Sequence, residues 1–215
     1  MNARHTDTVQ TGQPLPVPNH HASHPGFSGI SGLFAAVGFL FGRDNAARLA
    51  IDLAQLDAGD RLVDVGCGPG IAVQRAKARG AEAVGVDPSS EMLRVARARW
   101  RRDPNIAWRI GTAEALPVDD EWATVWWSLS TVHHWADVDG GLSEARRVLQ
   151  PGGRLVALER RIEDMNAEGV ASHGWTVGQS ESFAVHCRRQ GFTDVTVGEH
   201  PGDTTILSVT ATRPS

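Results

Sequence analysis

A glycine-rich segment with an acidic residue inside it, at residues 63–70, constrains the fold of this chain more than any other feature. It reads Val-Asp-Val-Gly-Cys-Gly-Pro-Gly and lies between a short apolar run at 61–65 and a helix-like stretch at 70–79. Glycines between a strand and a helix let the backbone turn tightly and approach a ligand closely. Such a loop is typical of an open α/β sheet, in which ligands bind beyond the carboxyl ends of the strands.

Strand-like and helix-like segments alternate along the rest of the chain. Further strands are expected at 83–86, 106–110, 124–128 and 154–159. Helices are expected at 46–53, 89–102, 136–149 and 176–190. Two later β-branched runs, 193–197 and 205–210, are close enough together to pair as a hairpin. We therefore predict an α/β fold, a Rossmann-like seven-stranded and mostly parallel sheet with an antiparallel edge hairpin and helices on both faces.

The residues before the first strand are expected to lie outside this sheet. Residues 1–24 are rich in Pro, His, Thr and Gln and predict a disordered tail. Residues 25–60 are assigned to an N-terminal cap and helix, and residues 61–215 to the core domain. The uncharged stretch 25–42 is only as long as the shortest membrane spans and contains five glycines. We interpret it as a buried helix or cap over the site rather than a membrane contact.

Composition limits the partners and the compartment. A net charge of −4 leaves no basic footprint for nucleic acid. The two cysteines, Cys67 and Cys187, form neither a disulfide framework nor a zinc-ligand pattern. The N-terminus has no signal-peptide layout. We expect a cytoplasmic protein, and the sequence leaves its oligomeric state open.

The glycine spacing discriminates between classes of ligand. In the dinucleotide fingerprint G-x-G-x-x-G/A the last position is small, but here the third glycine, Gly70, comes one residue early and Ile71 takes that place. Asp64 also stands two positions before Gly66. A carboxylate there would repel a pyrophosphate, whereas it suits a ligand that carries an ammonium and a sulfonium. S-adenosylmethionine carries both.

A second acidic residue completes the pattern of a nucleoside site. Asp87 ends the second predicted strand, 23 residues after Asp64 (87 minus 64). A carboxylate at that point can accept hydrogen bonds from both ribose hydroxyls. The alternative is that Asp87 only caps the helix that follows.

With these motifs the sequence resembles the class I S-adenosylmethionine-dependent methyltransferases, and more narrowly the small-molecule, type 11 branch that includes ubiquinone and menaquinone biosynthesis enzymes. The resemblance runs from about residue 61 to 159. Its motifs are Val-Asp-Val-Gly-Cys-Gly-Pro-Gly at 63–70, Gly-Val-Asp-Pro-Ser at 85–89, Gly-Thr-Ala-Glu-Ala-Leu-Pro at 111–117 and Leu-Gln-Pro-Gly-Gly-Arg-Leu at 149–155. The order and spacing of the motifs are together specific, although each alone is not.

The resemblance implies roles at matching positions. The methionine part of the cofactor would face Asp64, Gly66, Cys67, Gly68 and Gly70, and the ribose would bind Asp87, with Pro88 beside it. The adenine would contact Met92, Ala113 and Glu114, and Ser128 would stand near the methyl donor. Core packing is the alternative for Met92, and a solvated loop charge for Glu114.

Methyl transfer from a sulfonium needs alignment and exclusion of water, so a dedicated base is optional. His133 and His134 follow the fourth strand and are the base candidates, because histidine titrates near neutral pH. The alternative is a structural pair that anchors the loop. Trp126, Trp127 and Trp135 lie nearby, and strand alternation allows at most one of the first two to line a pocket. Aromatic lining would favour a flat or apolar acceptor, and core packing is the other interpretation.

Three function hypotheses remain after this reasoning. The favoured one is an S-adenosylmethionine-dependent methyltransferase with a small-molecule acceptor. The others are a protein that binds the cofactor without catalysis and, less favoured, an NAD(P)-dependent oxidoreductase. We expect no metal, because His20, His21 and His24 do not combine with the later histidine pair into a recognisable site.

Overall fold

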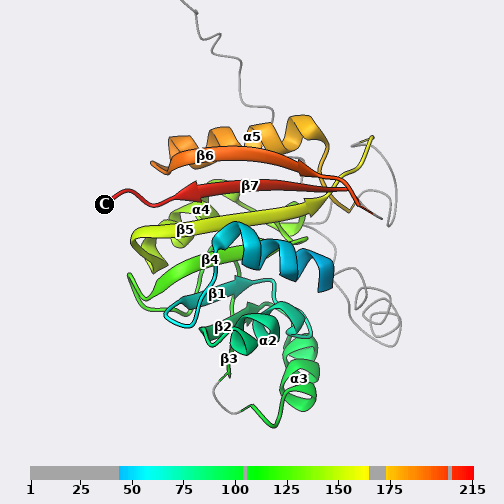
Figure 1. Cartoon of the computed structure of the whole chain (residues 1–215), viewed down its shortest axis with the longest axis vertical. Coiled ribbons are helices and arrows are strands. Elements are labelled where there is room, and N and C mark those ends of the chain that lie inside the picture. The colour runs from blue at the N-terminus through cyan, green and yellow to red at the C-terminus, as the bar shows by residue number, and fades with distance from the viewer. Residues whose placement is uncertain (1–43, 104–105, 165–172, 203–204) are drawn as a thin grey trace, which may run out of the picture.

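The computed structural model describes residues 44–103, 106–164, 173–202 and 205–215. Within these residues the chain forms one seven-stranded sheet with the strand order β3-β2-β1-β4-β5-β7-β6 (Figure 1). The strands are β1 (Arg61–Val65), β2 (Glu82–Asp87), β3 (Ile106–Ile110), β4 (Ala123–Leu129), β5 (Leu149–Arg160), β6 (Thr193–His200) and β7 (Ile206–Thr212). Strands β1 to β5 run parallel, and β7 pairs antiparallel with both β5 and β6. The predicted fold and its antiparallel edge are confirmed.

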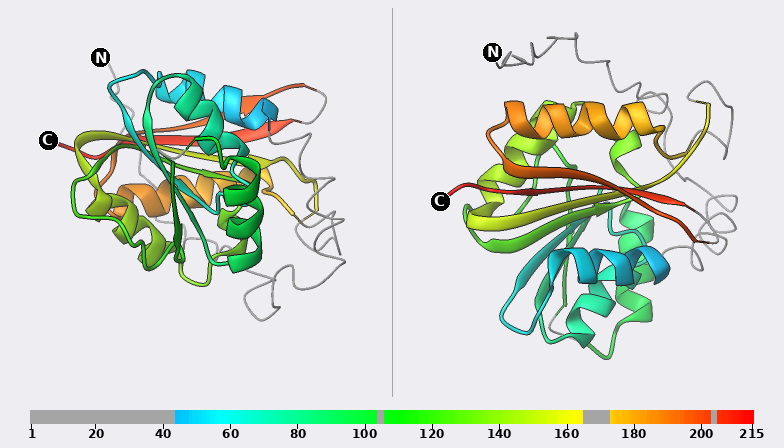
Figure 2. Two further views of the ribbon diagram at one scale, coloured as in Figure 1. Left: turned by 90° about the horizontal axis from the view of Figure 1, so that it is seen from below. Right: turned by 45° about the horizontal axis from the view of Figure 1, so that its top comes forward.

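Helices cover both faces of the sheet, as Figure 2 shows. The helices are α2 (Ile71–Ala78), α3 (Ser90–Arg99), α4 (Val138–Val148) and α5 (Val177–Arg189), with a helical segment at 44–54. One core cluster joins the sheet to α4 and α5, and the other joins it to the 44–54 segment, α2 and α3. Apolar residues on one side of each helix produce this sandwich, because each stripe is buried against one sheet face.

Local capping explains where two of the helices begin. The Ser89 hydroxyl accepts a hydrogen bond from the Met92 amide at 3.2 Å and caps α3, as its sequence position predicts. Thr176 and Gln179 form a reciprocal capping box at the start of α5. Helix α2 begins instead at Gly70 in the left-handed conformation, with φ of 80° and no side-chain cap. The glycine loop therefore serves as the start of α2.

Strand β5 is longer than the pattern predicts. It begins at Leu149 rather than Arg154, and the Pro-Gly-Gly sequence lies inside it instead of before it. The pairing with β4 jumps from Ala123–Leu149 to Val125–Arg154, so the extra residues form an irregularity in the ladder. The predicted tail at 1–24 and cap at 25–43 lie outside the described residues. Among the helices that the structure describes, none combines the length and apolarity of a membrane span.

Candidate cofactor site at the carboxyl ends of the strands

Strand register brings the first predicted cofactor residues together. Asp64 on β1 pairs with Gly85 on β2, and the next residue, Val65, pairs with Ser128 on β4. Asp64 is 2% exposed. A small cavity at this end of the sheet is lined by Asp64, Gly66, Cys67, Ala72 and Leu129. The structure thus places a buried carboxylate and bare loop backbone at the same edge.

Asp87 holds the glycine loop directly. Its Oδ2 accepts a hydrogen bond from the Gly68 amide at 2.8 Å, and its Oδ1 accepts one from the Ser89 amide at 2.9 Å. The side chain is 7% exposed. Gly66 and Cys67 donate their amides to the carbonyl oxygen of Val86. Asp87 therefore links the loop after β1 to the turn after β2, and any ribose contact would be added to this structural role.

Two tryptophans contact the same loop, and the sequence reasoning did not single out either of them for the site. The Trp108 ring on β3 lies so close to Gly70 that an added Cβ would come within 2.1 Å of its Cη2. The same ring crowds Gly85, its partner across the β2–β3 ladder. Trp100, at the end of α3, donates its indole N–H to the Pro69 carbonyl at 3.0 Å. Packing within the protein therefore requires glycine at position 70.

The first glycine of the loop faces the loop after β4. A Cβ at Gly66 would lie 2.4 Å from Cγ2 of Thr131. The Thr131 hydroxyl donates to the Val65 carbonyl at 3.1 Å and forms a hydrogen bond with the Ser128 hydroxyl at 2.5 Å. Ser128 is buried at the end of β4, where sequence reasoning placed it, and it helps hold β1 and the next loop together.

The predicted adenine residues lie near the ends of β2 and β3. Met92 is half-buried and belongs to neither core cluster, which weighs against simple core packing. Ala113 is buried in the α4–α5 core cluster, and Pro88 is exposed. Oε1 of Glu114 accepts hydrogen bonds from the amides of Ala136 and Asp137 at 2.9 and 3.2 Å. Glu114 is therefore an anchor for the start of α4 rather than a freely solvated charge.

The predicted histidine pair lies in a short 3-10 helix, Val132–His134, directly after β4. Nδ1 of His133 is 2.9 Å from Oε2 of Glu159, a fully buried carboxylate near the end of β5. The other oxygen of Glu159 accepts the Val132 amide at 2.8 Å. His133 is buried, whereas His134 is exposed. A third ring, that of His173, lies 5.4 Å from both of them, centroid to centroid.

The three tryptophans near this loop belong to the core. Trp126 and Trp127 are fully buried in different clusters on the two sheet faces, as strand alternation predicts. Trp135 packs edge-to-face on Trp126 at 5.8 Å and crowds Gly141. The core-packing interpretation is the one that the structure favours, and these residues give no reason to expect an aromatic acceptor.

Sequence reasoning did not single out five residues of this region for the site: Trp100, Trp108, Thr131, Glu159 and His173. Glu159 left a signal, since an acidic residue that closes the apolar run 155–158 is unusual unless it has a partner. His173 left none, because it is an isolated histidine about 40 residues after the pair.

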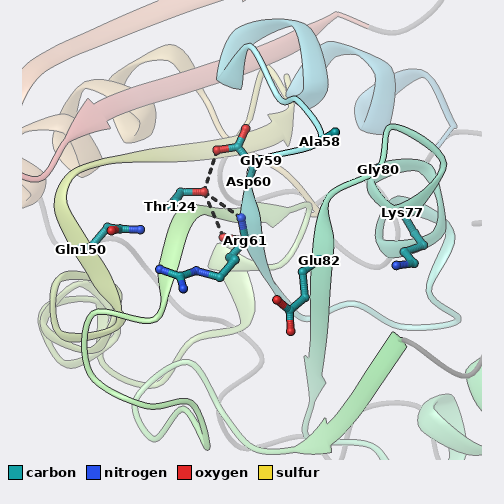
Figure 3. Close-up of a pocket in the computed structure, with 9 residues that line it drawn as sticks. All are labelled: Ala58, Gly59, Asp60, Arg61, Lys77, Gly80, Glu82, Thr124 and Gln150. Atoms are coloured by element: carbon teal, nitrogen blue, oxygen red, sulfur yellow. Dashed lines mark hydrogen bonds between the residues drawn. The ribbon is translucent and has the colours of Figure 1, made fainter.

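A larger cavity of about 710 Å³ lies at the opposite edge of the sheet, at the amino ends of β1, β2 and β4 (Figure 3). Asp60, Arg61 and Glu82 contribute to its lining. Asp60 accepts the Thr124 hydroxyl at 2.6 Å and forms an ion pair with Arg154, so its carboxylate is already used structurally. Ligands of open α/β sheets bind at the carboxyl ends, so this cavity is not assigned to the cofactor.

Comparison with known proteins agrees with this geometry. Residues 63–157 match the family model of the methyltransferase domain, type 11. A demethylmenaquinone methyltransferase of Tropheryma whipplei is 36% identical over 112 residues, which cover 52% of this chain and 46% of the relative. The chain thus aligns with about half the length of this curated relative.

Solved structures match over more of the chain. A SAM dependent methyltransferase from Aquifex aeolicus superposes with a TM-score of 0.66 at 16% identity, covering 78% of this chain and 89% of that one. The [4+2]-cyclase SpnF gives 0.67 at 19% identity, covering 80% and 81%. At such identities these likenesses establish the fold. Together with the match of residues 63–157 to a methyltransferase domain, which spans less than half of the chain, they make this chain similar to the type 11 branch of the class I methyltransferases, the family whose cofactor is S-adenosylmethionine.

Proposed function

We propose that this protein transfers a methyl group from S-adenosylmethionine to a small-molecule acceptor. The observation that carries the proposal is the pair of buried carboxylates, Asp64 and Asp87, that flank the glycine loop at the carboxyl ends of β1 and β2. Buried negative charge beside bare backbone complements a ligand with an ammonium and a sulfonium. The same arrangement would oppose the pyrophosphate of a nicotinamide dinucleotide.

In this proposal, different residues contact the methionine, ribose and adenine parts of the cofactor. Asp64 and the loop Gly66–Gly70 would face its methionine end, where the small cavity lies. Asp87 would accept hydrogen bonds from the ribose hydroxyls while it keeps its hydrogen bond from the Gly68 amide. Met92, Ala113 and Glu114 would surround the adenine, with Pro88 beside the ribose.

Bound at this site, the cofactor supplies an activated methyl group and a neutral thioether leaving group. The protein then has to hold the acceptor in line with the sulfur–methyl bond and keep water away. The loop after β4, with Ser128 buried at its start and His133 and His134 following, is the acceptor side of the site in this proposal. Either histidine would act as a base only for an acceptor that must lose a proton.

The acceptor class is drawn from two observations. The Tropheryma whipplei relative is named for a quinone precursor, which makes apolar ring compounds the first acceptors to screen. Between β5 and α5 only 16 residues intervene (positions 161–176), which leaves little chain for an added substrate domain. We therefore propose a small acceptor. We also propose a cytoplasmic reaction, which the two free, buried cysteines suit.

The test combines binding with turnover. Calorimetry should show S-adenosylmethionine binding and no comparable NADH binding, and labelled cofactor should methylate at least one small molecule in an acceptor screen. Binding of NADH alone would overturn the cofactor assignment. Tight cofactor binding without any transfer would favour a non-enzymatic binding protein or a reaction other than methyl transfer, since this fold also occurs in SpnF, a protein described as a cyclase.

A further inference from the structure

Three histidine rings from two distant segments converge beside the loop after β4. His133, His134 and His173 each offer a ring nitrogen, and these nitrogens all lie within 4.8 Å of one another. The rings of His133 and His134 are 4.0 Å apart between centroids. No other trio of His, Cys, Asp or Glu side chains in the described part of the chain has comparable geometry.

Contacts with Arg160 hold the segment around the third histidine in place. Arg160, the last residue of β5, donates its Nε–H to the His173 carbonyl at 3.0 Å and accepts the Trp175 amide at 2.9 Å. Gly174 lies between His173 and Trp175 in the sequence. A Cβ at Gly174 would lie 2.1 Å from the Arg160 carbonyl oxygen, so only glycine lets the chain pass this close to Arg160. The chain is thereby held against the end of β5, next to Glu159.

Glu159 prepares His133 as a ligand. A buried carboxylate accepts a hydrogen bond from the His133 Nδ1–H, so the lone pair of the ring lies on Nε2. The His133 side chain is 8% exposed, and among the described residues its Nε2 has no hydrogen-bond partner. A carboxylate that fixes the tautomer through the far nitrogen is the usual outer-shell arrangement of metal-bound histidines. A buried polar atom without a protein partner needs an explanation, and a bound ion is one that fits this geometry.

We propose that His133, His134 and His173 bind a divalent transition-metal ion, with Zn²⁺ the first candidate. Neutral imidazoles suit such ions, and three protein ligands leave the fourth tetrahedral position open. Zinc–nitrogen bonds of about 2.0–2.1 Å place tetrahedral ligands about 3.4 Å apart, so the cluster would tighten by up to about 1.4 Å on binding. At His133 the metal would take the lone pair that a general base would need, so the two roles exclude each other.

The open position gives the metal a chemical use. An acceptor with a hydroxyl or carbonyl oxygen could occupy it and be oriented by the metal. This use rests on the proposed function, whereas metal binding itself does not. The binding test therefore needs neither S-adenosylmethionine nor an acceptor, and each hypothesis can fail while the other survives.

The experiment is a titration of the chelator-treated full-length protein with Co²⁺ and Zn²⁺. Co²⁺ should give the visible absorption of a tetrahedral nitrogen site at one equivalent, and Zn²⁺ should displace it. His173→Gln should weaken Zn²⁺ binding at least tenfold, the scale on which even outer-shell changes act. Glu159→Gln should weaken it too, because it removes the carboxylate that orients His133.

The matched control is His200→Gln, which removes a half-buried histidine on β6 that bonds Ser208 outside the cluster. This variant should bind Zn²⁺ like the parent. The variant with all three cluster histidines changed to Gln should lose the cobalt spectrum while it keeps the parent far-UV circular dichroism. An unchanged titration in that folded triple variant would place any binding on the other histidines and overturn the proposal, as would the absence of stoichiometric binding by the parent.

Discussion

Substitution of Gly70 by alanine tests the argument that the protein itself, and not only its ligand, requires glycine in the loop. The new Cβ would lie 2.1 Å from Cη2 and 2.7 Å from Cζ3 of Trp108, whereas carbon atoms in contact prefer about 3.5–4.0 Å. The indole would have to move by more than 1 Å, and overpacking of this kind costs about 1–3 kcal/mol. The φ of 80° adds roughly 1–2 kcal/mol for a residue with a Cβ. Gly70→Ala should therefore destabilise the fold by about 2–5 kcal/mol.

A double-mutant cycle separates the two contributions. In a Trp108→Leu background the ring atoms that meet the new Cβ are gone, so Gly70→Ala should cost only the backbone strain, about 1–2 kcal/mol. The control is Gly152→Ala, where φ is 77° and nothing lies within 4 Å of the new Cβ. That substitution should cost the same strain in both backgrounds.

Urea unfolding followed by far-UV circular dichroism measures each free energy without depending on tryptophan fluorescence. An equal cost of Gly70→Ala with and without Trp108 would refute the packing argument. Calorimetry with S-adenosylmethionine on the same four proteins then asks a separate question. A loss of affinity that persists in the Trp108→Leu background would show that the cofactor also needs bare backbone at Gly70.

Three further outcomes are expected. Asp87→Ala should weaken S-adenosylmethionine binding by roughly 1–3 kcal/mol in calorimetry, and it should also lower stability because the buried Gly68 amide loses its acceptor; an unchanged dissociation constant would count against the ribose role. Arg147 lowers the pKa of Glu144 from its usual 4.5, so this pair stabilises the fold at neutral pH, and the benefit disappears as the pH falls through the lowered pKa. Glu144→Gln should thus lower the urea midpoint at pH 7 but make little difference in acid, and a constant gap at every pH would contradict this. Burial raises the pKa of the Cys187 thiol to about 12, so maleimide labelling should require unfolding, and rapid labelling of the native protein would show that the site opens.

Much of the fold could be predicted because its signals are local. Apolar runs, glycine turns and capping residues such as Ser89 act over a few positions, so they indicate each strand and helix without knowledge of its neighbours. The start of β5 was misplaced for the opposite reason. The Pro-Gly-Gly sequence at 151–153 is typical of a turn, but backbone hydrogen bonds of Gly152 and Gly153 to Arg213, just after β7, hold it within the strand.

The cofactor site was partly predictable for a related reason. In a parallel sheet the carboxyl ends of neighbouring strands meet at one edge, so Asp64 and Asp87 could be expected together from their places at strand ends. The hydrogen-bond partners of these residues could not be predicted from the sequence. That Asp87 binds the Gly68 amide, and that Glu114 holds the start of α4, depends on how the loops fold over that edge.

The sequence by itself determined the order of strands and helices, the turn after β1 and the class of cofactor, because each of these depends on the spacing of nearby residues. Only the tertiary structure decided which side chains meet. It set Trp108 against Gly70, and it placed both the His173 ring and the Glu159 carboxylate beside His133. These contacts join residues tens of positions apart, and they arise from sheet register and from the path of the chain back to β5. No periodicity within a single segment encodes such a meeting.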